Sequence, residues 1–422
     1  MKKHIINLIK HPLISGSSIV VVGSMMASVL NYLFNLEMGR MLSVSDYGIF
    51  SSLISLFNIF SVFSLTIITV FTKFTATFVG EKNEKLIRPL FIKGSLWIGG
   101  IALIISGLII IFSSQISHFL NITQTLLVDI TSVSLFFAFL TSIGMGILQG
   151  ALKFFSLSFL NIFSSIVKLV LGVVLVVAGF KALGAVEAFF LASLFAYIYM
   201  FFPLREYIKK SSLDEVYVPD LHKSLSIYAI PVFFSTLGMT AFVTIDIILV
   251  KHFFNPDTAG QYSALSLMGR SIFYVVAPIT TVLFPLIAQK KERKEKLFGT
   301  LSLSMLLILI PSVLLSFIYF FFPDLVIHLF FPAKAYRVLA PLTGIFSVFI
   351  ILYTLSFLLT NFYLSIGKTK VFLFTIIGAL LEVVFISIFH QNLVQIIYGL
   401  IAISSLLLIS LLIYYPITQR EK

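Results

Sequence analysis

Residues 302–322 read SLSMLLILIPSVLLSFIYFFF and contain no charged side chain. A helix needs about 20 apolar residues to cross the roughly 30 Å hydrocarbon core of a bilayer, and this stretch has that length. Similar runs recur along the whole chain, which is 59% hydrophobic and 11% charged, with a mean hydropathy of +1.09. Soluble globular proteins are about 25% charged. The composition therefore excludes a water-soluble protein.

The apolar runs, separated by charged residues or by Pro and Gly, predict twelve membrane-spanning helices. Short connections join two pairs of them, so eleven or thirteen spans fit the pattern as well. No loop is large enough to form an extramembrane domain. The predicted spans are 14–36, 47–72, 89–112, 127–149, 155–178, 183–204, 224–250, 262–288, 297–322, 338–361, 369–390 and 393–415.

The distribution of basic residues predicts the orientation of these spans. With the N-terminus inside, 22 of the 29 Lys and Arg residues fall in inside segments and 5 in outside loops, while Lys168 and Arg270 lie within spans. Basic residues concentrate on the cytoplasmic side of membrane proteins. We therefore expect both termini to be cytoplasmic, and we do not interpret the net charge of +12 as a sign of nucleic-acid binding.

Three ordered matches at nearly one offset indicate an internal duplication. EKNEKL at 81–86 resembles ERKEKL at 292–297, Gly48 aligns with Gly260, and His118 aligns with His328. Transporters often carry such repeats. The prediction is an all-α polytopic integral membrane protein of about 12 transmembrane helices, in two six-helix pseudo-symmetric bundles around a central cleft. The bundles would comprise residues 1–210 and 211–422.

Polar side chains recur at helical spacing in five of the spans, and four of these spans are candidates for a central cleft. Asn31 lies in the first, Asn58 in the second, Asp246 in the seventh, and Arg270 and Tyr274 in the eighth. A polar face within hydrocarbon depth turns toward protein or water, so these residues are candidates for the lining of a substrate cleft. The alternative is packing between helices, which also favours small polar residues.

Charged residues within the spans are candidates for transport chemistry. Asp246 and Arg270 lie at nearly equal predicted depth, so they are expected either to pair or to bind substrate. Lys168 is a further cleft candidate, and an alignment of 161–170 with 375–384 places Glu382 at the equivalent position of the second repeat. A carboxylate at that depth is costly to keep ionised. Glu382 is thus a candidate for proton coupling, with Lys168 as its candidate partner, or else a structural acid.

Several enzyme signatures are missing from the sequence. The chain has no cysteine, no GxxxxGK[ST] phosphate-binding loop and no HExxH motif, and its seven His residues lack metal-ligand spacing. We expect no cofactor, no metal site and no catalytic residue. These absences argue against an enzyme, although they do not exclude a membrane enzyme of glycan assembly.

Several segments together resemble the Wzx-like oligosaccharide flippases of the multidrug/oligosaccharidyl-lipid/polysaccharide (MOP) exporter superfamily. They include GRMLSVSDYGIFS at Gly39–Ser51, MGILQGALKFFSLS at Met145–Ser158 and KALGAVEAFFLA at Lys181–Ala192. The second half adds IDIILVKHFFNPDTAGQYSA at Ile245–Ala264 and YLSIGKTK at Tyr363–Lys370. The likeness covers nearly the whole chain.

The resemblance implies a flippase in the cytoplasmic membrane. Such a protein moves an isoprenoid-pyrophosphate-linked oligosaccharide to the outer leaflet by alternating access, and Arg270 would be its cleft cation. The implied partners are the lipid-linked glycan, the bilayer and glycan-assembly proteins, with no nucleic acid. A drug or small-solute exporter of the same superfamily and a membrane enzyme of surface-glycan assembly are the alternatives.

Overall fold

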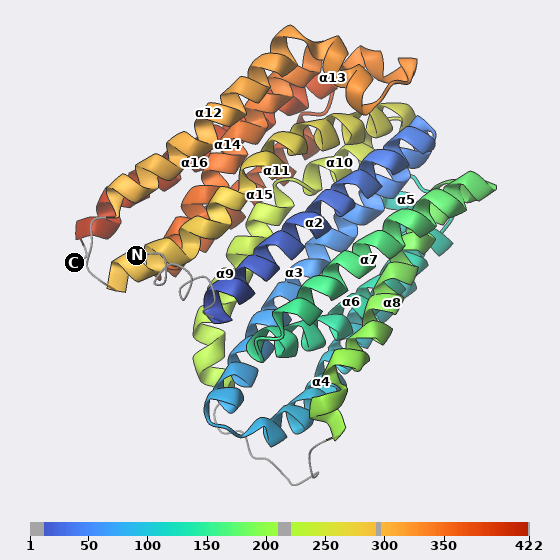
Figure 1. The fold of residues 1–422 in the computed structure, drawn as a ribbon. Helices are drawn as coiled ribbons and strands as arrows, with labels where there is room; N and C mark the ends of the chain where they lie inside the picture. Colours follow the sequence, from blue (N-terminus) through green and yellow to red (C-terminus); the bar gives the residue numbers. More distant parts are fainter. Residues whose placement is uncertain (1–11, 210–220, 293–296, 421–422) are drawn as a thin grey trace. The chain divides into compact units, whose positions relative to one another are not determined.

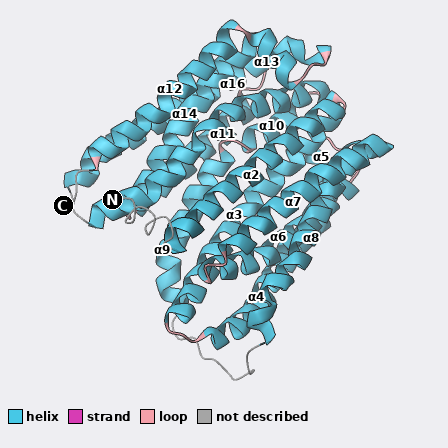
Figure 2. Ribbon diagram, in the orientation of Figure 1, coloured by secondary structure: helices cyan, strands magenta, loops and turns pink. Residues whose placement is uncertain are grey.

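The computed structural model of the chain describes residues 12–209, 221–292 and 297–420. All regular structure in these ranges is helical, and no strand occurs in them (Figure 2). Helices satisfy their own backbone hydrogen bonds, which is what a chain embedded in hydrocarbon requires.

The structure divides into two compact units, each built from two stretches of chain. Unit 1 comprises residues 1–41 and 60–225, and unit 2 comprises residues 42–59 and 226–422. The long helix α3 contributes to both, because its first part belongs to unit 2 and its remainder to unit 1. The predicted boundary between residues 210 and 211 falls outside the described residues, and the division there stays a prediction.

Unit 1 is a bundle in which α2 packs on α7, α7 on α8, α8 on α6 and α6 on α4 (Figure 1). A π-helical turn with Gly179 at φ 94° joins α7 directly to α8. The elements of unit 1 are α2 (Pro12–Met41), α3 (Val44–Gly80) from Phe60 onward, η1 (Glu84–Leu86), α4 (Ile87–Ile111), α5 (Ser113–Phe119), α6 (Leu126–Gly150), α7 (Phe154–Leu175), η2 (Val176–Phe180) and α8 (Lys181–Lys209).

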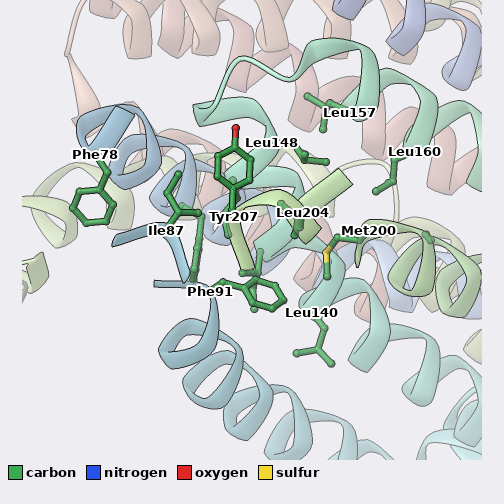
Figure 3. Close-up of a cluster of buried hydrophobic side chains, with 14 residues drawn as sticks. Phe78, Ile87, Phe91, Leu140, Leu148, Leu157, Leu160, Met200, Leu204 and Tyr207 are labelled. Carbon is green, nitrogen blue, oxygen red and sulfur yellow. The ribbon is translucent and has the colours of Figure 1, made fainter. Parts of the chain in front are cut away.

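A cluster of buried apolar side chains holds α6, α7 and α8 together near the connection between α6 and α7. Met200, Leu204 and Tyr207 of α8 gather with Leu148 of α6 and Leu157 of α7 (Figure 3). Met200 and Leu148 are fully buried. Because lipid is as apolar as these side chains, close packing rather than water exclusion stabilises this contact.

Unit 2 is arranged around α14, which packs against α11, α12 and α16, while α15 packs against α16 and α10. Its elements are the first part of α3, α9 (Leu221–Ala241) from Ser226 onward, α10 (Ile245–Phe253), α11 (Pro256–Glu292), α12 (Phe298–Phe321), α13 (Pro323–Phe330), η3 (Lys334–Leu339), α14 (Ala340–Ser365), η4 (Thr369–Val371), α15 (Phe372–Ile388) and α16 (Leu393–Arg420).

Each of the twelve predicted spans coincides with a helix, but the seventh is divided into α9 and α10. By length and composition, eight helical stretches of the described residues suit a membrane crossing, or nine if the bent α9–α10 pair is one span. One of these stretches, Phe154–Tyr207, contains both α7 and α8. Large apolar side chains such as Trp97 and Leu96 are exposed on the helix surfaces. The chain is a multi-pass, all-α membrane protein.

Candidate functional site

The site in unit 2 begins at a break in the seventh span. Helix α9 ends at Ala241, α10 begins at Ile245, and the two axes differ by 41°. At this break a turn-like hydrogen bond replaces the regular helical pattern of bonds between residues four apart. The backbone N–H of Thr244 donates to the carbonyl of Ala241, three residues earlier, at 3.0 Å. The Thr244 hydroxyl donates to the Thr240 carbonyl at 2.7 Å, an arrangement that often bends helices. Such a break leaves backbone carbonyls that need partners.

Arg270 of α11 meets this break. A terminal N–H of its guanidinium donates to the backbone carbonyl of Val243, which lies between α9 and α10. Its Nε is buried and has no hydrogen-bond partner. The guanidinium therefore both stabilises the broken span and keeps donor capacity for a further acceptor.

Asp246 lies in the first turn of α10, where the helix dipole favours a negative charge. Its side chain is fully buried, and one carboxyl oxygen accepts a hydrogen bond of 2.7 Å from the Tyr262 hydroxyl. The other oxygen has no hydrogen-bond partner. Arg270 interacts electrostatically with this carboxyl group. Asp246 and Arg270 thus lie near enough to interact electrostatically, and the expectation that they pair or bind substrate stays a prediction.

Glu382 of α15 is also fully buried, and neither of its carboxyl oxygens has a hydrogen-bond partner. It interacts electrostatically with Asp246. A glycine permits the close helix approach behind it, since a methyl group on Gly378 would lie 2.7 Å from the Phe242 ring. Small residues at such crossings allow two membrane helices to approach closely. The predicted pairing of Glu382 with Lys168 joins residues of different units and stays a prediction.

We call Asp246, Tyr262, Arg270 and Glu382 the buried polar cluster. It combines two carboxyl groups with one guanidinium, and four of its atoms (Asp246 Oδ1, Arg270 Nε and both Glu382 carboxyl oxygens) have no hydrogen-bond partner. The guanidinium suits a phosphate, whereas the carboxyl pair suits a cation or a proton. Among the described residues, no group of three or more His, Cys, Asp or Glu side chains is placed to hold a metal ion.

Two of the predicted cleft residues meet in unit 1. The Lys168 ammonium of α7 donates a hydrogen bond to the side-chain oxygen of Asn31 on α2. Asn58 is half-buried on the part of α3 that belongs to unit 2. Tyr274 on α11 is 46% exposed, and its ring packs edge-on against Phe273. The predicted cleft residues therefore fall into a group in unit 2 and a pair in unit 1, and their common role stays a prediction.

Sequence reasoning did not identify Tyr262 or the break at Val243. Tyr262 precedes Arg270 by eight residues on the same helix, so a search along that helical face would have found it. The break had a weaker signal in the sequence, namely Thr240 and Thr244 at i, i+4 spacing. Only the structure shows that Arg270 reaches the carbonyl between the two helices.

Comparison with known proteins identifies the neighbours of this fold. Residues 13–291 match the family model described as polysaccharide biosynthesis protein. No curated protein sequence matches the chain. The fold is similar to an inward-facing multidrug resistance MATE family transporter of the MOP superfamily, with a TM-score of 0.74, 13% identity, and coverage of 94% of this chain and 99% of that one.

Two further structures have the same fold. The lipid II flippase MurJ in an inward closed conformation is similar with a TM-score of 0.71 and 17% identity, over 94% of this chain and 87% of that one. A MOP superfamily transporter from Pyrococcus furiosus is similar with a TM-score of 0.65 and 16% identity, over 96% and 95% of the two chains. At these identities the likeness concerns the fold.

Proposed function

We propose, from the premise that the chain belongs to the polysaccharide biosynthesis protein family, that it is a flippase for an isoprenoid-pyrophosphate-linked oligosaccharide. The observation that carries the proposal is the family match over residues 13–291, on a multi-pass fold that MOP superfamily transporters share. The lipid II flippase MurJ has the same fold, and this favours a lipid-linked cargo.

Such a cargo needs a polar path across the membrane. Glycan hydroxyls that enter hydrocarbon lose hydrogen bonds to water, at a cost of roughly 2–7 kcal/mol for each uncompensated group. Polar side chains within the protein replace those bonds while the isoprenoid tail stays in lipid. In our proposal, the two units expose this path alternately to the cytoplasmic and outer sides.

Arg270 is the residue that we assign to the cargo pyrophosphate. Its Nε has no hydrogen-bond partner, and a guanidinium binds phosphate through charge-assisted hydrogen bonds. Asp246 and Tyr262 would position it, and Glu382 would couple transport to a proton. The residues proposed to line the rest of the path are Asn58 and Tyr274.

The charge distribution supports an orientation with both termini in the cytoplasm, in the cytoplasmic membrane of the cell. Export from the inner to the outer leaflet then delivers the glycan to proteins that assemble it outside. The chain would act as a transporter and not as an enzyme, because the cargo leaves it chemically unchanged.

Flipping in reconstituted vesicles tests this proposal. Vesicles that contain the purified protein receive a fluorescent isoprenoid-pyrophosphate-linked oligosaccharide in both leaflets, and a membrane-impermeant quencher reports the fraction that exchanges. Exchange that depends on the protein and is lost in Arg270→Ala supports the proposal. Exchange equal to that of protein-free vesicles contradicts it, and a chemically altered cargo would indicate an enzyme.

A second candidate function, export of cationic drugs, is favoured by one specific observation. Asp246 and Glu382 place two carboxyl groups in a fully buried location, and a carboxylate attracts a cationic solute. A drug exporter would lower the accumulation of an organic cation in cells and would lose this effect in Asp246→Asn. The flippase leaves cation accumulation unchanged.

A further inference from the structure

The ammonium group of Lys168, a half-buried residue of unit 1, lies among side chains from two neighbouring helices. Its Nζ donates to the side-chain oxygen of Asn31 on α2, and it lies 5.2 Å from the centre of the Phe34 ring on the same helix. The Phe189 ring of α8 is 4.8 Å away. Both ring distances are within the roughly 6 Å at which aromatic faces attract cations. We call Asn31, Phe34 and Phe189 the ammonium cage.

Hydrogen bonds determine which end of the Asn31 side-chain amide faces the ammonium. The Asn31 amide nitrogen donates to the Ala27 carbonyl at 2.8 Å and to the Ser165 hydroxyl at 3.0 Å. Ser165 in turn donates to the Asn161 carbonyl at 2.8 Å. Because both amide hydrogens are used, Asn31 presents only its oxygen to the interior of the cage. An amide oxygen and two ring faces favour a cation and give an anion no donor.

The backbone is shaped to admit one of the rings. Gly172 lies one turn after Lys168 on α7, and a methyl group there would lie 2.6 Å from the edge of the Phe34 ring. Any larger side chain would push Phe34 away from the ammonium. The close approach of α2 and α7 is therefore part of how the cage is built.

The cage replaces a counter-ion. Within the described residues, no carboxylate interacts electrostatically with Lys168. A charged side chain within a membrane helix is costly unless protein groups compensate it. Here the amide oxygen and the two aromatic rings supply the compensation.

We propose that α2, α7 and α8 form a cation-binding site that the chain fills with its own Lys168 ammonium, and that this resident cation holds α2 against α7. The ligand class of the site is a small primary ammonium ion, which would bind when the lysine side chain is shortened. This inference goes beyond the proposed transport of a glycan, and it assigns Lys168 a place within unit 1 instead of a contact with cargo.

Chemical rescue tests the proposal. Lys168→Ala removes the ammonium and opens space in the cage, so the melting temperature of the purified full-length protein should fall. Propylammonium chloride should restore it in a saturable way and leave the wild-type melting temperature unchanged. Sodium chloride at the same ionic strength should not restore it.

Lys153→Ala is the matched control. Lys153 lies just before α7 and binds Glu206 at 2.6 Å on the exposed surface, outside the cage. Propylammonium should not stabilise this variant. In the Lys168→Ala background, Phe189→Leu should weaken the apparent affinity for propylammonium by about 3- to 30-fold, the effect of one lost cation–π contact.

Several outcomes would overturn the proposal. These are a wild-type melting temperature for Lys168→Ala, equal stabilisation of variant and wild type by propylammonium, or an equal effect of sodium chloride. A variant of normal stability that has lost flipping would make Lys168 a cargo ligand instead. If Lys168→Ala does not fold, Phe189→Leu gives the answer in two other backgrounds. It should lower the melting temperature more in the wild type than in Lys168→Met, and equal losses contradict the cage. Failure of Arg270→Ala to affect flipping would count against the proposed function and leave the cage untouched.

Discussion

Gly48 of α3 and Gly260 of α11, which the predicted repeat places at equivalent positions, lie directly against each other in unit 2. A methyl group on Gly48 would lie 2.9 Å from the backbone nitrogen of Gly260. A methyl group on Gly260 would meet the backbone of Val44, with the carbonyl carbon only 2.6 Å away. Backbone atoms cannot move aside as a flexible side chain can, so no side chain fits between the two helices at this crossing.

Gly260→Ala should therefore lower the stability of the protein by about 1–3 kcal/mol, the usual cost of overpacking. The measurement is thermal unfolding in detergent, followed by circular dichroism. Gly107→Ala is the matched control, because nothing lies within 4 Å of the added methyl group. That substitution should be neutral or stabilise the helix by about 0.5–1 kcal/mol. Equal melting temperatures for the two variants would contradict the close crossing.

Labelling of single cysteines checks the predicted orientation. The sequence has no cysteine, so each introduced thiol is the sole target. Asp257 is exposed in the first turn of α11 and is predicted to face outside, whereas Glu81 is exposed in a loop predicted to face the cytoplasm. A membrane-impermeant maleimide should label Asp257→Cys in intact cells and Glu81→Cys only after the membrane is opened. The reverse pattern would refute the orientation.

Arg270→Ala should abolish flipping, because the proposed site for pyrophosphate disappears. It also leaves the Val243 carbonyl without its guanidinium partner, at a cost of about 1–3 kcal/mol in stability. Arg270→Lys keeps the charge but loses the planar fork, so it should retain part of the activity. Flipping rates and melting temperatures must both be measured, because normal flipping in a folded Ala variant would rule out the cargo role.

Tyr262→Phe removes the 2.7 Å hydrogen bond to Asp246 and leaves this buried carboxyl group without its side-chain donor. The expected loss of stability is about 1–3 kcal/mol. The effect should not add to that of Asp246→Asn, since the two side chains share one interaction. Tyr398→Phe, at a ring that is 56% exposed, is the control and should leave the melting temperature unchanged. Full additivity of the two buried substitutions would contradict the contact.

Glu382→Gln mimics the protonated acid. If Glu382 binds a proton in one step of transport, this variant should fold normally and should flip cargo at a rate that no longer depends on pH. Since neither oxygen of Glu382 has a hydrogen-bond partner, loss of its charge should not reduce stability. The measurement is the rate of flipping in vesicles across a series of pH values. A wild-type pH profile in this variant would end the coupling hypothesis.

The amino-acid sequence was sufficient to predict the class of fold and the course of the chain. Eleven of the predicted spans coincide with one helix each and the seventh with two, because a run of about 20 apolar residues in hydrocarbon satisfies its own backbone hydrogen bonds as a helix. The short helices α5 (Ser113–Phe119) and α13 (Pro323–Phe330) were not predicted, since each is too short to register as a span. The resemblance to MOP superfamily flippases, seen in segments such as Gly39–Ser51, is confirmed by the family match and the fold.

Tertiary structure alone decided which polar residues meet. The sequence identified Arg270, Asp246, Glu382 and Lys168 individually, because a charge within an apolar run is conspicuous. It did not show that Glu382 interacts electrostatically with Asp246, since that interaction depends on how α10 and α15 pack.

Helix packing also explains the two contacts on which the site and the ammonium cage depend. Arg270 reaches the carbonyl of Val243 only because the seventh span breaks there. The Lys168 ammonium lies near the rings of Phe34 and Phe189 only because α2 and α8 both pack against α7. Hydropathy depends on each residue's own side chain, and so the sequence by itself determined the spans. Which polar side chains contact one another depends on how helices from distant parts of the sequence rotate and cross, and only the packed structure decides this.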